Sequence, residues 1–257
     1  MNNDIKKILK IIKSMEEYYN KKFLNTQIII NNCNLKDNQT SVTEFDIDIT
    51  DYCIKKINEN FENSNIIIEE DNSTNSNNFN DLTWIIDPLD GTASFIRSYP
   101  VWGIGIAVLY KKEPIVSYFY TPLANQKFLA YGDKIFVNNK DMQSNQAILT
   151  DDTKTIFISS KLHEKISFDD LKGYKLRNFG STIYHIFLVS IGKAESCIIG
   201  SCYLWDIAAV FYLANQNNYS FYEYKTDKII TLDELLKYSS NKIDKILQFK
   251  KVSSANE

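Results

Sequence analysis

One stretch organises the chain: Trp84-Ile85-Ile86-Asp87-Pro88-Leu89-Asp90-Gly91-Thr92. Its leading apolar residues predict a short buried strand, and Pro88, which lacks a backbone N–H, is expected to end that strand. Gly91 permits a turn, and Thr92 is a good N-cap for the helix that follows. The stretch therefore predicts a strand, a rigid turn and a helix start, with Asp87 and Asp90 held at the turn.

The two carboxylates of this turn indicate a particular chemistry. Aspartate is common in turns, so Asp87 and Asp90 could serve only as turn formers. However, two neighbouring anions repel each other, and a site that keeps both ionised needs a cation between them. The backbone amides of Gly91 and Thr92, at a helix N-terminus, are suited to binding a phosphate oxygen. Metal-binding acids beside an anion pocket indicate metal-assisted phosphate chemistry.

Length and composition exclude several classes of protein. The 257 residues are 44% apolar and 24% charged, which is typical of a globular protein with a sizeable core. The net charge of −3 gives no general attraction to nucleic acid or membrane. The sequence has no apolar run of about 18 residues and no signal-peptide core at its N-terminus. Its four cysteines lack CxxC spacing, so we expect reduced thiols and a cytoplasmic protein.

Periodicity divides the chain into elements. An amphipathic helix is expected at 4–20, an exposed polar loop at 31–42, and a second helix that begins near Asp46 and includes Ile57. Residues 101–131 read as an antiparallel meander, and strands and helices alternate from about 151. No element is assigned to the tail after 238. Strands are expected at 66–68, 101–110, 113–120, 127–131, 155–159, 175–179 and 195–199, with one or two more beyond 218, and further helices at 182–191, 205–214 and 232–238.

Other acidic residues also follow apolar runs. Glu69-Glu70 comes directly after a run of isoleucines, and Asp206 follows Tyr-Leu-Trp. Taken alone, Glu69 is a solvated strand end, Asp206 is a helix N-cap, and Asp46 is a capping or surface residue. Together with the 84–92 stretch they have another interpretation, because acids at the ends of buried elements are costly unless they are paired or bind metal.

These residues carry a family resemblance. Asp87-Pro88-Leu89-Asp90-Gly91-Thr92 with Phe95, preceded by Glu69-Glu70 and followed by Trp205-Asp206-Ile207-Ala208-Ala209, resembles the inositol monophosphatase family. That family comprises magnesium-dependent, lithium-sensitive phosphomonoesterases, and the resemblance runs from about Val42 to Ala209. It implies the sugar-phosphatase fold, an α+β and α/β layered sandwich. An N-terminal α+β half (1–150) and a C-terminal α/β half (151–257) would meet at the metal site.

The resemblance also implies a set of metal ligands. Glu69, Asp87 and the backbone carbonyl of Leu89 would bind one Mg²⁺, and Asp87, Asp90 and Asp206 would bind a second. Glu69 would also reach a third, weaker ion. Mn²⁺ is expected to substitute for Mg²⁺, and Li⁺ is expected to inhibit.

Catalytic and substrate-binding roles follow from the same resemblance. Asp46, the acid of a Val-Thr-x-x-Asp stretch, would polarise the attacking water together with Thr92, and Glu69 is the third catalytic residue. The amides of Gly91 and Thr92 would hold the phosphate. The Gly180-Ser181-Thr182 segment would contact the alcohol part of the substrate.

The expected function is that of a cytoplasmic phosphomonoesterase acting on a small phosphorylated metabolite, with a homodimer as the family's common assembly. Family members that bind inositol carry a glutamate in the strand before Trp-Asp, and this chain has Ile198-Ile199-Gly200 there. The substrate is therefore left open. A bisphosphate nucleotidase, a histidinol phosphatase and a non-enzymatic, metal-regulated scaffold are the alternatives. Asn217-Asn218 replaces a family glycine pair after the Trp-Asp helix, and asparagine tolerates the left-handed turn.

Overall fold

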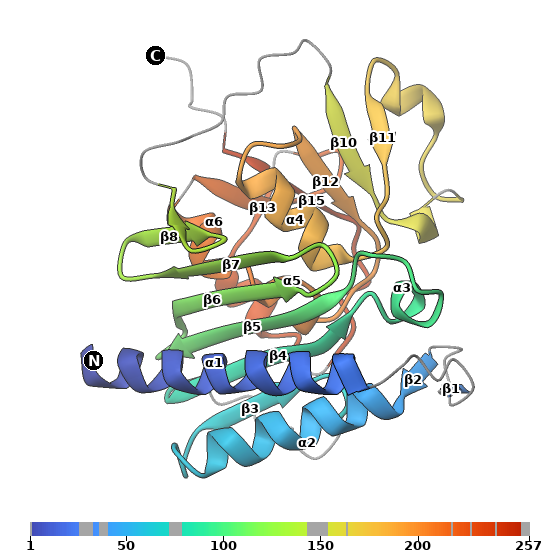
Figure 1. The fold of residues 1–257 in the computed structure, drawn as a ribbon. Helices are drawn as coiled ribbons and strands as arrows, with labels where there is room; N and C mark the ends of the chain where they lie inside the picture. The colour runs from blue at the N-terminus through green and yellow to red at the C-terminus, as the bar shows by residue number, and fades with distance from the viewer. Residues whose placement is uncertain are drawn as a thin grey trace.

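The computed structural model describes residues 2–25, 33–35, 41–71, 79–142, 154–162, 164–216, 218–226, 228–239 and 241–252. Two large sheets and the helices packed on them make up the fold (Figure 1). The helices are α1 (Asn2–Asn25), α2 (Glu44–Asn58), α3 (Thr92–Ile96), α4 (Thr182–Ser190), α5 (Trp205–Ala208), α6 (Phe211–Gln216) and α7 (Leu232–Leu236), with short 3₁₀ turns at Ser160–Leu162 and Phe168–Leu171. Among the described residues, no helix is both long and apolar enough to cross a membrane.

The first sheet has seven strands in the order β3-β4-β5-β6-β7-β8-β9. Only the β3–β4 pair is parallel, and the other pairs are antiparallel. This confirms the meander that the sequence predicts. The strands are β3 (Asn65–Ile68), β4 (Leu82–Asp90), β5 (Gly103–Tyr110), β6 (Glu113–Thr121), β7 (Gln126–Tyr131), β8 (Lys134–Val137) and β9 (Lys140–Asp141).

The second sheet has six strands in the order β11-β10-β12-β15-β13-β14. The tail, to which the sequence pattern assigned no element, supplies β15, which lies inside this sheet between β12 and β13. The alternation of apolar and polar residues in β15 covers only five residues, which is too short to distinguish a strand from an exposed tail. The strands are β10 (Thr155–Ile158), β11 (Lys175–Arg177), β12 (Ser196–Ile199), β13 (Tyr219–Glu223), β14 (Ile229–Ile230) and β15 (Leu247–Lys251).

Helices cover both faces of the seven-stranded sheet (Figure 1). α1 and α2 pack on one face, and α5 and α6 pack on the other, while α4 and α6 also contact the six-stranded sheet. The alternation of β4 shows this division, because Ile86 joins the core under α1 and α2 whereas Ile85 joins the core between the sheets. The site motif of β4 therefore lies where the two cores meet.

Three expectations about local structure need correction. The strand does not end at Pro88, because β4 continues to Asp90 across a register shift between Asp87 and Asp90 in its pairing with β5. β3 pairs with β4 only as far as Ile86, so the missing N–H of Pro88 disrupts no ladder on that side.

Part of the predicted 31–42 loop is a two-stranded hairpin, β1 (Cys33–Leu35) with β2 (Ser41–Thr43), while 36–40 lie outside the described residues. The single helix expected at 205–214 is split into α5 and α6.

The predicted helix cap is also wrong. Gly91, not Thr92, is the N-cap of α3, with φ 90° and ψ 35° and no side-chain cap hydrogen bond. A side chain at Gly91 would bring a Cβ to 3.2 Å from the carbonyl oxygens of Gly180 and Val101. Thr92 is the first helical residue, and its Oγ1 donates to the carbonyl of Leu89 at 3.1 Å. The hydrogen bond from Thr92 to Leu89 and the close packing of Gly91 against the Gly180 backbone thus hold the turn.

Asparagine does take the left-handed conformation after α6. Asn218 has φ 56°, as expected for the residue that replaces a glycine there, and Asn217 lies outside the described residues.

Candidate active site

Four segments of the chain bring carboxylates together at the end of β4. Asp87 and Asp90 are in β4, and Glu69 follows β3, where its N–H donates to the Ile86 carbonyl at 3.3 Å. Asp46 lies in the first turn of α2, and Asp206 in the first turn of α5. Asp87 interacts electrostatically with the other four carboxylates. These five acids therefore share one electrostatic environment around Asp87.

Asp87 is at the centre of this cluster. Its side chain is 1% exposed, and its Oδ1 accepts the Leu89 N–H at 3.0 Å. Burial raises the pKa of Asp87 well above its usual value, and repulsion from Glu69 is the next largest cause. Among the described residues, no lysine or arginine forms an ion pair with Asp87. A buried carboxylate surrounded by like charges is stabilised by a cation.

Asp90 is held by the N-terminus of α4. Its carboxylate accepts the Ser181 hydroxyl, the Thr182 N–H at 3.0 Å and the Ile183 N–H at 2.9 Å. Burial raises the pKa of Asp90 to about 7, although these three donors lower it. The segment expected to contact substrate therefore also binds a proposed metal ligand. Sequence reasoning missed this contact, and the only local signal was Ser181 as the N-cap of α4.

Asp206 and Glu69 are only half-buried, unlike the two aspartates of β4. Asp206 Oδ2 accepts the Tyr203 N–H at 2.6 Å, which fixes the carboxylate at the start of α5. The neighbouring Trp205 ring stacks on Tyr203 with centroids 4.7 Å apart. Both acids are therefore more accessible to solvent than Asp87.

The donor set suits magnesium, although it is not preassembled. Within the described residues, no three acidic, histidine or cysteine side chains already stand together as a metal-ligand group. Asp87, Asp90 and Asp206 each direct an oxygen at a backbone N–H, yet a carboxylate has about four lone-pair positions and can accept a metal as well. The five acids offer only hard oxygen ligands, which Mg²⁺ prefers. The residues present therefore fit such an ion.

A histidine supports the substrate-side segment without being a ligand. His185 in α4 is 3% exposed, and its Nε2 accepts the Phe179 N–H at 2.7 Å. The ring stacks on Phe157 with centroids 4.9 Å apart, and burial lowers the pKa of His185 to about 4. The imidazole is thus neutral and holds the turn that leads into Gly180. The side chain of the other histidine, His163, lies outside the described residues.

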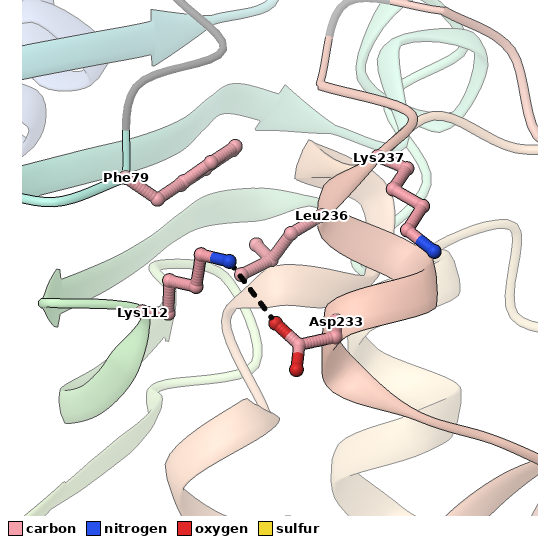
Figure 2. Close-up of a pocket in the computed structure, with 5 residues that line it drawn as sticks. All are labelled: Phe79, Lys112, Asp233, Leu236 and Lys237. Atoms are coloured by element: carbon pink, nitrogen blue, oxygen red, sulfur yellow. Dashed lines mark hydrogen bonds and ion pairs between the residues drawn. The ribbon is translucent and has the colours of Figure 1, made fainter.

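A separate cavity lies at the far end of β4. Its volume is about 470 Å³, and Figure 2 shows the Lys112–Asp233 pair among its lining residues, with Nζ and Oδ1 3.5 Å apart. Lys112 follows β5, whose Tyr110 pairs with Leu82 at the start of β4. None of the five carboxylates lines this cavity, so it is not part of the candidate active site. Its lining residues are Phe79, Lys112, Asp233, Leu236 and Lys237.

Known proteins share the sequence pattern and the fold of this chain. The sequence model of the inositol monophosphatase family matches residues 3–244. The inositol monophosphatase of Dictyostelium discoideum is 28% identical over 189 residues, which is 68% of this chain and 69% of that relative. The histidinol-phosphatase of Streptomyces coelicolor is 25% identical over 142 residues, 49% of this chain and 53% of the relative. A solved structure, an IMPase/NADP phosphatase complexed with Mg²⁺ and phosphate, has the same fold, with a TM-score of 0.79 at 21% identity over 98% of this chain and 97% of that one.

Proposed function

The chain belongs to the inositol monophosphatase family, whose members are phosphatases that hydrolyse phosphoric monoesters, and we propose that it is a Mg²⁺-dependent phosphomonoesterase. We propose a small phosphorylated alcohol, similar to an inositol or sugar phosphate, as its substrate. One observation carries the proposal: Asp87, fully buried, shares one electrostatic environment with Asp46, Glu69, Asp90 and Asp206. Divalent cations bound in this cluster would offset the repulsion among its carboxylates and would bind the phosphate group of an ester.

The proposed metal ligands are those that the family resemblance implies. Glu69, Asp87 and the Leu89 carbonyl would hold one ion, Asp87, Asp90 and Asp206 would hold a second, and Glu69 would reach a third. The Leu89 carbonyl already accepts the Thr92 hydroxyl and retains a second lone pair. When bound, Mg²⁺ supplies charge neutralisation for the ester, a lowered pKa for bound water, and stabilisation of the leaving alkoxide. A Mg²⁺ ion in the related solved structure supports this choice, and we expect Mn²⁺ to substitute and Li⁺ to inhibit.

The remaining roles belong to the chain's own groups. Asp46 and Thr92 would orient the attacking water, and the buried Asp46 carboxylate would accept its proton. The amides of Gly91 and Thr92 would bind the phosphate oxygens. Residues 180–182 would lie against the alcohol, next to the Asp90 carboxylate that two of them hold.

The strand before the Trp-Asp motif bears on the identity of the alcohol. Ile198 and Ile199 are buried in β12, where inositol-binding relatives carry a glutamate. A site without that hydroxyl-binding group discriminates poorly among polyols. A 3′(2′),5′-bisphosphate nucleotidase is therefore the second candidate, and the related IMPase/NADP phosphatase favours a nucleotide substrate. A histidinol phosphatase is a third, favoured by the relative of that name.

A panel of phosphate monoesters tests the proposal. The purified protein is incubated with inositol, sugar, nucleoside bisphosphate and histidinol phosphates, with and without Mg²⁺, and released phosphate is measured. Release that requires Mg²⁺ and is lost in Asp87→Asn supports the phosphomonoesterase. Selective release from adenosine 3′,5′-bisphosphate would favour the nucleotidase, and no release with Mg²⁺ or Mn²⁺ would favour a scaffold.

We also propose that the enzyme is a cytoplasmic homodimer, as the family resemblance suggests. Light scattering of the purified protein measures the oligomeric state directly, and a mass equal to that of one chain would contradict the dimer.

A further inference from the structure

Two buried hydroxyls in α1 and α2 have no hydrogen-bond partner among the described residues. Tyr19 in α1 is 0% exposed and Thr50 in α2 is 4% exposed, and neither Tyr19 Oη nor Thr50 Oγ1 makes a hydrogen bond there. A buried polar group without a partner costs free energy, and native proteins usually satisfy it with protein or with ordered water. The two side chains therefore need a common explanation.

The packing of α1 against α2 brings the segments that contain Tyr19 and Thr50 side by side. Tyr18 stacks on Tyr52 with ring centroids 3.8 Å apart, and Lys22 pairs with Asp48, so the two helices run antiparallel. Tyr19 thus lies opposite the part of α2 that contains Thr50. Asp46 and Thr50 are four residues apart, and they share one buried face of α2.

The Tyr19 side chain extends toward the catalytic turn. Its ring meets Phe45 edge-on at 4.9 Å and lies 6.1 Å from Trp102, measured between centroids. Trp102 in turn packs beside Gly91, where a Cβ would be 3.3 Å from that of Trp102. Burial raises the pKa of Tyr19 well above its usual value, and the charge of Asp46 is the next cause. The phenol is therefore a proton donor directed at an anionic region.

We propose that Tyr19 Oη and Thr50 Oγ1 bind a buried water molecule that donates a hydrogen bond to Asp46, which makes Tyr19 a positioning residue for that carboxylate. The inference rests on the proposed function, in which Asp46 orients the attacking water. The bound water accepts from Tyr19 Oη and donates to Thr50 Oγ1 and to the carboxylate, so it has the two to four partners that buried waters require. Removing a group that orients a metal ligand typically costs about 10- to 100-fold in metal affinity or activity, and we expect a similar size of effect for a group that orients Asp46.

Paired substitutions test the positioning role. Tyr19→Phe keeps the ring and removes the hydroxyl, and we expect kcat to fall about tenfold or more while KM changes little. The matched control is Tyr118→Phe, because Tyr118 is also buried. Its hydroxyl donates to Glu16 in α1 at 2.7 Å, and Glu16 is not one of the five carboxylates of the site. That control should keep the wild-type kcat. Thr50→Val should resemble Tyr19→Phe, and Thr50→Ser, which retains a hydroxyl, should restore kcat.

A crystal structure at high resolution gives a readout that does not depend on activity. We expect ordered density for a water within hydrogen-bond distance of both hydroxyls in the wild-type protein and its loss in Tyr19→Phe. A wild-type site without that water, or a Tyr19→Phe variant with unchanged kcat, would overturn the inference. If the wild type hydrolyses no ester, the proposed function fails and the positioning role fails with it, while the density still decides the water site.

Discussion

His185 is buried in its neutral form, so the stability of the folded protein should depend on pH through this residue. Its Nε2 accepts the Phe179 N–H, so a proton on that nitrogen would remove the hydrogen bond and place a charge beside Phe157. We consider the substitution His185→Gln, whose side-chain oxygen can still accept the Phe179 N–H but does not titrate.

The size of the effect follows from the pKa. Burial lowers the pKa of His185 from 6.5 to about 4. Below pH 6.5 the His185 side chain therefore binds a proton in the unfolded chain but stays neutral in the folded chain. The free energy of unfolding is unaffected by this group above pH 6.5 and decreases as the pH falls toward 4. At about 1.4 kcal/mol for each pH unit, the full loss is about 3.5 kcal/mol, and about 2.5 kcal/mol of it is reached at about pH 4.5.

Denaturant unfolding of both proteins at about pH 7.5 and about pH 4.5 measures this loss. At the higher pH we expect His185→Gln to be about 1 kcal/mol less stable than wild type, because the stacking on Phe157 is lost. At the lower pH the order should reverse. The carboxylates are the same in both proteins, so their titration cancels from the difference. A difference that is equal at both pH values would refute the neutral, buried imidazole.

Three further predictions concern the site and the turn that builds it. Asp90→Asn should abolish turnover in a phosphate-release assay while circular dichroism shows an intact fold, and wild-type activity would contradict the role of Asp90. Mg²⁺ should raise the melting temperature, since about a hundredfold excess over Kd adds about 2.7 kcal/mol to the stability of the folded state. Asp87→Asn should melt higher than wild type without metal, because it removes a buried charge from the cluster, and should respond less to Mg²⁺; an equal Mg²⁺ response would argue against Asp87 as a ligand. Gly180→Ala should cost about 2 kcal/mol of unfolding free energy, because its φ is 81° and the new Cβ would lie 2.3 Å from Ser94 Oγ. Gly173→Ala is its control, with φ 87° but open space around the Cβ, and should cost only about 1 kcal/mol; equal losses would argue against the close packing at Gly180.

The sequence by itself determined the local elements and the selection of acids. The alternation of residues 101–131 specifies a meander, because side chains on a strand repeat every two residues. The turn at Asp87–Thr92 can be recognised because proline, glycine and paired aspartates act through neighbouring backbone atoms. Glu69 and Asp206 stand out because each follows an apolar run, and the family motif connects them before any coordinates are known.

The tertiary structure alone decided which groups hold these acids in place. Pro88 stays within β4 because the bulge opposite Gly103–Gly105 accommodates it, and the Asp90 carboxylate accepts donors from residues more than ninety positions away. β15 enters the middle of a sheet from a tail whose own pattern is too short to interpret. Local periodicity reports only which face of an element is buried. The partner across that face, such as Tyr52 stacked on Tyr18, depends on how distant segments pack together.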